Sequence, residues 1–102
     1  MTRYVKLLEI CIELQVDDEM LREVTDEGLV EVRAPASGGE PLVSAEDAER
    51  LRVIRVLMRE MGVNLAGVEV ILHMREDALS LRRQVDEMVR DLVRELRLRL
   101  ER

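Results

Sequence analysis

Apolar residues at helical spacing are the feature that most limits how this chain can fold. The pattern is clearest in residues 77–101, where a stripe follows the i, i+3, i+4, i+7 spacing of one helix face. Its members are Leu81, Val85, Met88, Val89, Leu92, Val93 and Leu96. Phe and Trp are absent and Tyr occurs once, so the core must be aliphatic. An aliphatic core at this spacing favours packed helices over a β-sandwich.

The N-terminal part of the chain predicts two short helices followed by a hairpin. The first helix covers residues 5–14, where two apolar sets follow helical spacing, and Asp17 or Asp18 caps the second, which ends at Gly28. The second helix is expected to bury Met20, Leu21 and Val24. Two short helices joined by a tight turn form a helix-turn-helix. Strand-like residues around a Pro-Ala-Ser-Gly-Gly segment then predict a small wing, whose second strand Pro41 shortens.

The rest of the chain predicts three more helices. Ser44 starts the first of them, with Asp47 in the place of the usual Glu of a capping box, and Gly62 ends it. The apolar residues of that helix are Leu51, Ile54, Leu57, Met58 and Met61. Asn64 caps a short helix that ends before residue 77, and the last helix covers residues 77–101. We therefore expect three parts: the helix-turn-helix with its wing (1–43), a two-helix remainder (44–76) and a long amphipathic helix (77–102).

The long last helix has little domain left to pack against. An amphipathic helix of this length is expected to pair with its own copy or with a partner helix, which makes the protein a homodimer in the simplest case. The pairing residues would be Val85, Met88, Val89, Leu92 and Leu96. The alternative is that the helix folds back on the two helices before it.

Charge is distributed unevenly along the chain. Residues 1–43 contain four basic side chains against ten acidic ones, whereas residues 44–102 contain twelve of each. The first part therefore carries the whole net charge of −6. A surface of this sign repels phosphate and attracts a basic partner.

Residues that support chemistry are few and scattered. His73 is the one histidine, and no Cys, Asp or Glu lies at metal-ligand spacing to complete a site with it. Cys11 is the one cysteine, and its apolar surroundings favour a buried thiol. Gly38 and Gly39 lack the Lys of a phosphate loop. We therefore expect a protein that is not an enzyme and has no cofactor, metal or small-molecule ligand.

The sequence predicts no membrane segment. No apolar run approaches the roughly 20 residues that span a bilayer. Glu9 and Glu13 interrupt the N-terminal apolar stretch, which also lacks the small-residue cleavage site of a signal peptide. A lone cysteine suits a reducing compartment, so we expect a cytoplasmic protein.

A distinctive pattern covers residues 44–72, which read SAEDAERLRVIRVLMREMGVNLAGVEVIL. In it, a basic and apolar helix is followed by a GVNL break and an AGV helix start. Together with the helix-turn-helix and wing before it, this order resembles the MerR superfamily over roughly residues 4–90. The resemblance is closest to the CbpM-type chaperone modulators, with HspR-like repressors second. It implies an all-α, winged helix-turn-helix fold with a small β-hairpin wing and a long C-terminal helix.

The second helix departs from the DNA-reading form of the family at its contact positions. In DNA-binding members this helix reads T-[LIV]-R-x-[YW]-E-x-x-G-[LI], with the Thr and Arg close to the DNA. Here Met20 stands at the Thr position, Arg22 is retained, and Glu23 and Val24 occupy the usually aromatic positions. The wing, typically rich in Arg, has only Arg33.

The same segment follows the acidic pattern of the CbpM-like branch, E-E-x-L-x-E-[IV]-x-x-x-G-[VL], over residues 18–24 and then Gly28 and Leu29. Proteins of this branch bind the J-domain of a DnaJ- or CbpA-type co-chaperone near the surface used for DnaK, and so inhibit or tune the chaperone cycle. J-domains present a basic second helix, which an acidic helix attracts. The resemblance thus implies a partner-binding surface made of Asp18, Glu19, Arg22, Glu23 and Asp26.

The alternative is a MerR- or HspR-like transcriptional regulator that binds DNA. Its phosphate contacts would be Arg22, Arg33 and Lys6, together with Arg3. Affinity for DNA depends on neutralised phosphates, and these four basic residues are scattered among ten acidic ones. Charge therefore favours the protein-binding interpretation.

Overall fold

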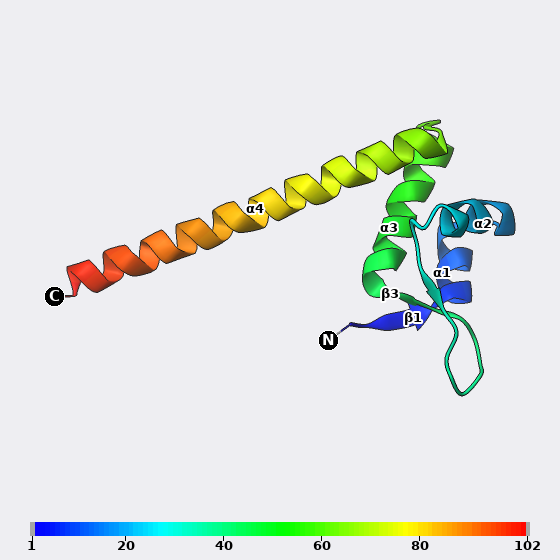
Figure 1. Ribbon diagram of the computed structural model, residues 1–102, viewed down its shortest axis with the longest axis horizontal. Coiled ribbons are helices and arrows are strands. Elements are labelled where there is room, and N and C mark those ends of the chain that lie inside the picture. The colour runs from blue at the N-terminus through cyan, green and yellow to red at the C-terminus, as the bar shows by residue number, and fades with distance from the viewer. Residues whose placement is uncertain (1, 102) are drawn as a thin grey trace. The chain divides into compact units, whose positions relative to one another are not determined.

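The structure is a computed structural model that describes residues 2–101 (Figure 1). The chain divides into two compact units, with the boundary between residues 69 and 70. Most of the described residues are helical, and a small three-stranded sheet belongs to the first unit. This secondary structure is compatible with the predicted helix-turn-helix fold. The sheet has one strand more than the two strands of the predicted wing.

The additional strand lies at the start of the chain. β1 (Tyr4–Lys6) pairs antiparallel with β3 (Leu42–Ser44), with Val5 opposite Val43, and α1 (Leu7–Leu14) begins after it. The helix predicted over residues 5–14 therefore starts two residues too early. A short apolar run fits a strand and a helix equally well by its spacing, and here the pairing with a distant strand decides.

A tight turn joins α1 to α2 (Asp18–Asp26). Gln15 ends α1 in the left-handed region with φ of 59°, and the N–H of Val16 donates to the carbonyl of Cys11 at 2.9 Å. Asp17 is the N-cap of α2, because its Oδ1 accepts the N–H of Met20 at 2.8 Å. Of the two predicted candidates for this cap, the structure selects Asp17.

α2 ends in a Schellman motif at Gly28. The N–H of Gly28 donates to the carbonyl of Thr25 at 3.0 Å, and the N–H of Leu29 donates to the carbonyl of Val24 at 3.1 Å. Gly28 has φ of +72°, a conformation that strains residues with a side chain. The prediction that Gly28 terminates this helix is confirmed.

The wing is part of a sheet with the strand order β1-β3-β2. β2 (Val32–Arg33) pairs antiparallel with β3, with Val32 opposite Val43, so the predicted hairpin is present. The predicted two-stranded wing shares its second strand with β1, which makes β3 the central strand. Val43 is fully buried as a result.

α3 (Ala45–Arg55) continues into a π-helical segment, η1 (Val56–Glu60), in which the N–H of Met61 donates to the carbonyl of Val56 at 3.1 Å. The helical span ends at Gly62, as predicted. The i to i+5 bonding of a π segment shifts the side chains out of the 3.6-residue register. Met61 is therefore 66% exposed, although the sequence pattern assigned it to the apolar set of this helix.

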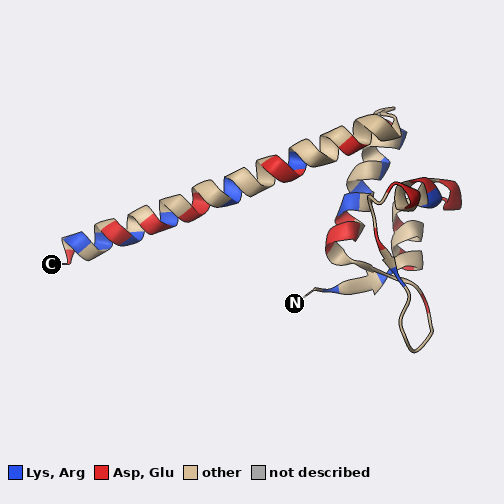
Figure 2. Cartoon of the chain, viewed as in Figure 1, with Lys and Arg blue, Asp and Glu red and all other residues tan. Residues whose placement is uncertain are grey.

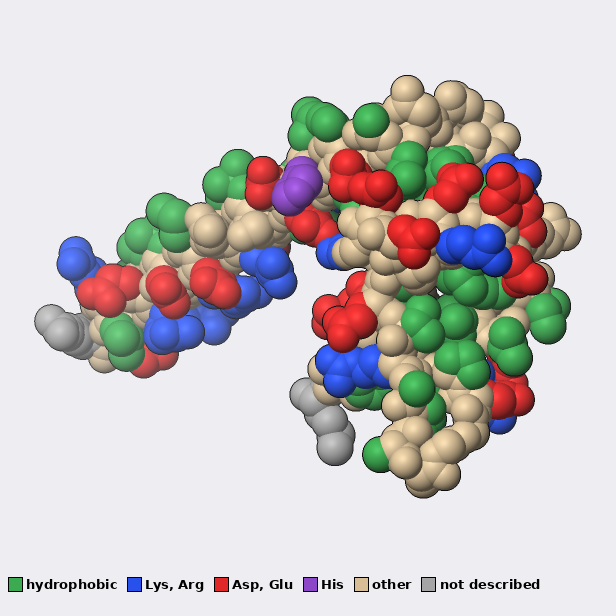
Figure 3. Space-filling model, turned by 45° about the vertical axis from the view of Figure 1, so that its right-hand side comes forward, with side chains coloured by type: hydrophobic (Ala, Val, Ile, Leu, Met, Phe, Trp, Pro, Cys, Tyr) green, Lys and Arg blue, Asp and Glu red, His purple; other side chains and the backbone are tan. Residues whose placement is uncertain are grey.

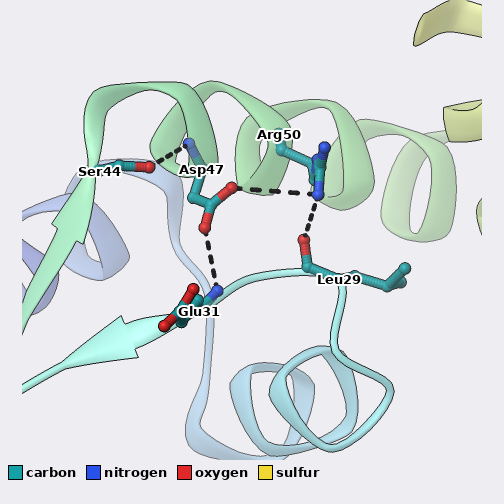
Figure 4. A network of polar contacts seen from close by, with 5 residues as sticks. All are labelled: Leu29, Glu31, Ser44, Asp47 and Arg50. Atoms are coloured by element: carbon teal, nitrogen blue, oxygen red, sulfur yellow. Dashed lines mark hydrogen bonds and ion pairs between the residues drawn. The ribbon is translucent and has the colours of Figure 1, made fainter. Parts of the chain in front are cut away.

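Asp47 connects α3 to the segment between α2 and the wing (Figure 4). Ser44 caps α3 as predicted, with its Oγ accepting the N–H of Asp47 at 3.0 Å. The carboxylate of Asp47 accepts the N–H of Glu31 at 3.0 Å and lies 4.0 Å from Arg50, which donates to the carbonyl of Leu29 at 3.0 Å. α3 thus holds two backbone groups that lie outside any regular element, which fixes the path of the chain into β2.

The core of the first unit is aliphatic, as the composition predicted. Its fully buried side chains come from α2, β3, α3 and the first turn of α4 (Leu65–Leu100). They are Val24, Val43, Leu51, Ile54 and Val68. Met20 is also buried, at 3% exposure, and Leu21 is half-buried. The predicted inward side of the second helix is therefore correct for Met20 and Val24 and only partly correct for Leu21.

α4 is one continuous helix, which corrects the prediction of two helices separated near residue 76. Asn64 caps its start as predicted, with Oδ1 accepting the N–H of Gly67 at 2.8 Å. Residues 73–77 contain no Gly or Pro to interrupt backbone hydrogen bonds, so the helix continues through the predicted break. Among the described residues, no helix is both long and apolar enough to cross a membrane.

Replacing Asp47 by Ala should destabilise the first unit by about 1 kcal/mol, because the N–H of Glu31 loses its hydrogen bond to the carboxylate and Arg50 loses one of its contacts. Chemical denaturation followed by circular dichroism measures the change. The matched control is Glu46→Ala, one residue away and exposed, which should stay within about 0.5 kcal/mol of wild type. Equal unfolding midpoints for Asp47→Ala and the control would contradict the assigned role.

Candidate functional site

The residues predicted to bind a partner lie together on the solvent side of α2. They are Asp18, Glu19, Arg22, Glu23 and Asp26, and all five are exposed. Successive helix residues are rotated by about 100°, which places these five within one arc, opposite Met20 and Val24. Figure 2 shows acidic residues along α2 with a basic one among them. We call this set of five residues the acidic face.

The acidic face carries uncompensated negative charge. Its four carboxylates surround one basic side chain, that of Arg22. None of the five side chains forms a hydrogen bond or an ion pair with another residue in the part of the chain that the structure describes. Their charges are therefore available to a partner, although Asp18 and Glu19 in the first turn also interact favourably with the helix dipole.

Asp17, immediately before the acidic face, has a different role. Its Oδ2 lies 2.6 Å from Nη2 of Arg59, while its Oδ1 accepts the N–H of Met20. The bond from Met20, followed by that from Arg59, lowers the pKa of Asp17 below its ordinary value of 3.8. This contact ties the start of α2 to η1 and pairs the guanidinium of Arg59 with Asp17.

A groove that the sequence analysis did not single out lies beside the start of α2. It has a volume of about 450 Å³ and is lined by Leu8, Cys11, Ile12, Gln15, Val16, Asp17 and Asp18. Leu8 is 50% exposed and Ile12 is 79% exposed, so α1 presents an apolar pair to solvent. The signal was in the sequence, because α1 carries two apolar sets at helical spacing and a short helix cannot bury both. Leu7 is the one buried residue of α1, and Leu8 and Ile12 of the other set are exposed.

Cys11 lines this groove and is half-buried, where the sequence predicted a buried thiol. Partial burial, followed by the negative charge of Asp18, raises the pKa of the Cys11 thiol above 9.0. The thiol is therefore protonated near neutral pH. Its position still makes it a local reporter of whatever occupies the groove.

A family model for MerR helix-turn-helix regulatory proteins matches residues 5–90. The chain belongs to the MerR helix-turn-helix family. No curated protein and no solved structure matches it. The match agrees with the predicted superfamily and covers the helix-turn-helix, the wing and most of α4. It makes the chain a MerR-family regulatory protein, a class that typically has no enzymatic activity.

The basic residues that a DNA-binding MerR protein would use lie on three different elements here. Lys6 is in β1 and lies 3.8 Å from the carboxylate of Glu40, while Arg33 is in β2 with its guanidinium 5.3 Å from the ring centre of Tyr4. Arg22 is on α2 within the acidic face. The structure therefore leaves each of the three next to a carboxylate or an aromatic ring.

The residues predicted for pairing of the last helix lie on α4 and are exposed in the single chain. They are Val85, Met88, Val89, Leu92 and Leu96, with exposures from 49% to 70%. Figure 3 shows hydrophobic side chains along one edge of this helix and charged side chains on the neighbouring surface. An exposed apolar stripe of this length is typical of a helix that pairs with another.

His73 is exposed on α4. Within residues 2–101, no three His, Cys, Asp or Glu side chains are grouped so that they could hold a metal ion.

The pKa of Asp17 gives a pH-dependent prediction. Because folding lowers this pKa below 3.8, the ionised carboxylate stabilises the fold at neutral pH, and that contribution is lost as the pH falls through and below 3.8. Asp17→Asn keeps a capping side chain but has no charge for Arg59. The stability gap between wild type and Asp17→Asn should therefore be present at pH 7 and shrink below about pH 3.8. Denaturant titrations across this range measure it, and a gap that widens in acid would contradict the assignment.

Proposed function

We propose that this MerR-family protein binds the J-domain of a DnaJ- or CbpA-type co-chaperone through the acidic face of α2, and modulates chaperone activity without catalysing a reaction. The observation that carries the proposal is the uncompensated charge of that face, whose four carboxylates have no cationic partner within the described chain. It stands where a DNA-binding relative would present its phosphate contacts. The resemblance to CbpM-type modulators supplies the class of partner.

The electrostatics support a basic protein partner. A cluster of exposed carboxylates attracts a basic helix over several ångströms and raises the association rate, whereas it repels the phosphates of DNA. Arg22 lies one helical turn from Asp18 and Asp26 and offers a planar guanidinium, which binds a carboxylate through two hydrogen bonds. One arginine among acidic residues would therefore align the partner, while the carboxylates supply the attraction.

A second copy of the chain is the proposed partner of the apolar stripe on α4. A homodimer would cover side chains that are 49% to 70% exposed in the single chain. It would also present two acidic faces. If the co-chaperone carries two J-domains, binding of the first J-domain would raise the effective concentration of the second and so increase the overall affinity.

Reversing charge on the acidic face should strongly weaken binding to the J-domain. Glu23→Lys combined with Asp26→Lys replaces two attractive charges with two repulsive ones, and truncated or reversed close charge pairs at interfaces typically cost about 2 kcal/mol or more, a loss of at least about thirtyfold in affinity. Isothermal titration of the purified J-domain of the cell's own co-chaperone measures the affinity.

The matched control for this experiment is Glu31→Lys combined with Glu46→Lys. These two residues are exposed in the same unit, outside α2, and give the same change in net charge. Their variant should retain most of the wild-type affinity. Equal losses in both variants would show that overall charge matters and the acidic face does not.

Binding to DNA is the second candidate function, and the family match to regulatory proteins favours it. Four phosphate contacts, with Arg3 included, would give a slope of about −3.6 in a plot of log affinity against log salt. We expect random duplex DNA, followed by fluorescence anisotropy at low salt, to show binding weaker than micromolar and little salt dependence. Micromolar or tighter binding with the steep slope, lost on Arg22→Ala with Arg33→Ala, would establish the DNA-binding function instead.

A further inference from the structure

We propose that the acidic face and the apolar groove beside it form one docking surface, and that its occupant is a basic amphipathic helix whose apolar side seats on Leu8 and Ile12. The proposal deepens the proposed function, because it specifies how the same partner would be held. It extends the partner-binding surface from α2 to two uncharged residues of α1, Leu8 and Ile12. The acidic pattern of α2 does not predict a role for these residues.

The groove supplies the apolar part of this surface. Leu8 and Ile12 are one helical turn apart on α1, and their exposed sides border a concavity of about 450 Å³. Concave apolar sites that accept one or two large side chains are where binding energy concentrates in interfaces. A partner helix that carries apolar residues at i, i+3, i+4 and i+7 matches a pair with this spacing.

Asp18 makes the groove and the acidic face continuous. It lines the groove and is also the first residue of the acidic face. Its neighbour Asp17 is bound to Arg59, but the carboxylate of Asp18 forms no hydrogen bond or ion pair within residues 2–101. Figure 3 shows exposed hydrophobic side chains beside acidic ones on this unit.

The free carboxylate of Asp18 determines the charge of the occupant. A partner seated in the groove removes water from this carboxylate, and a charge buried without a counter-ion is costly. A neutral or acidic helix would leave it unpaired, whereas a Lys or Arg one turn from the apolar anchor would pair with it. The same helix would then carry its remaining basic residues towards Glu19, Glu23 and Asp26.

A synthetic peptide tests the surface without assuming the identity of the partner. The probe is a helical peptide of Leu and Lys in amphipathic order with one Trp, whose fluorescence is read directly because the protein contains no Trp. The control peptides have the same composition in scrambled order, or Glu in place of Lys. The full-length wild type should bind the Leu-Lys peptide and neither control.

The variant that removes the apolar anchors is Leu8→Gln with Ile12→Gln. Because both side chains are already half or more exposed, the fold should persist, which circular dichroism confirms. Each anchor buried by a partner is worth about 1 kcal/mol or more, so the affinity should fall at least about tenfold. The matched control, Met61→Gln, changes a 66% exposed apolar residue of the same unit and should bind as wild type does.

Cys11 gives a readout confined to the groove. It is the one cysteine of the chain and lines the groove with both anchors, so saturating peptide should slow its alkylation by a maleimide several-fold. Unchanged alkylation at saturation, or equal peptide affinity for wild type and the double Gln variant, overturns the proposal. So does a loss of self-association in the double Gln variant by sedimentation, since a second copy would then be the occupant.

The purified J-domain separates this proposal from the proposed function. If wild type binds the peptide through Leu8 and Ile12 but does not bind the J-domain, the docking surface stands and the co-chaperone function fails. If the J-domain binds and responds to Glu23→Lys with Asp26→Lys, but not to the double Gln variant, the function stands and the groove proposal fails.

Discussion

The burial of Met20 and Val24 decides which side of α2 meets solvent, and the rest of the site depends on it. Both side chains belong to the aliphatic core that includes Leu51 and Ile54, at exposures of 3% or less. A rotation of α2 by one residue would turn a carboxylate such as Glu23 towards that core, where an unpaired charge is costly. The apolar pair and the acidic residues therefore favour the same orientation. The acidic face is exposed because its own charges are excluded from the interior.

The position of α2 is set at both of its ends by contacts that the acidic face does not share. At the start, Asp17 combines the cap with an ion pair to Arg59. At the end, Gly28 reverses the chain, and Asp47 and Arg50 then hold the backbone that leads to the wing. The helix-turn-helix thus separates its structural carboxylates from those available for binding. A site built on a helix fixed at both ends presents its side chains with little reorganisation when a partner binds.

Sequence predicted the features that depend on neighbouring residues. Asp17, Ser44 and Asn64 act as caps because each accepts the N–H of the residue three positions later, and that spacing is visible in the sequence. The features it missed depend on distant partners: β1 forms because β3 lies beside it, and the exposure of Met61 follows from a π-helical turn. The exposure of the acidic face follows from its spacing relative to Met20 and Val24. The groove was missed because the degree to which each apolar side chain of α1 is buried depends on the space left by α3 and the sheet.

Part of the acidic face is unfavourable for the isolated helix, although Asp18 and Glu19 in the first turn interact favourably with the helix dipole. Glu19 and Glu23 are like charges one turn apart, and Asp26 stands in a last turn that contains no basic residue, where the helix dipole disfavours an anion. Such repulsive pairs and terminal charges each cost a few tenths of a kcal/mol to about 1 kcal/mol. A cationic helix placed along the face would remove this repulsion on binding, in addition to forming new ion pairs. Part of the affinity would therefore come from relief of a cost already present in the free protein, and that part should weaken as salt screens the repulsion.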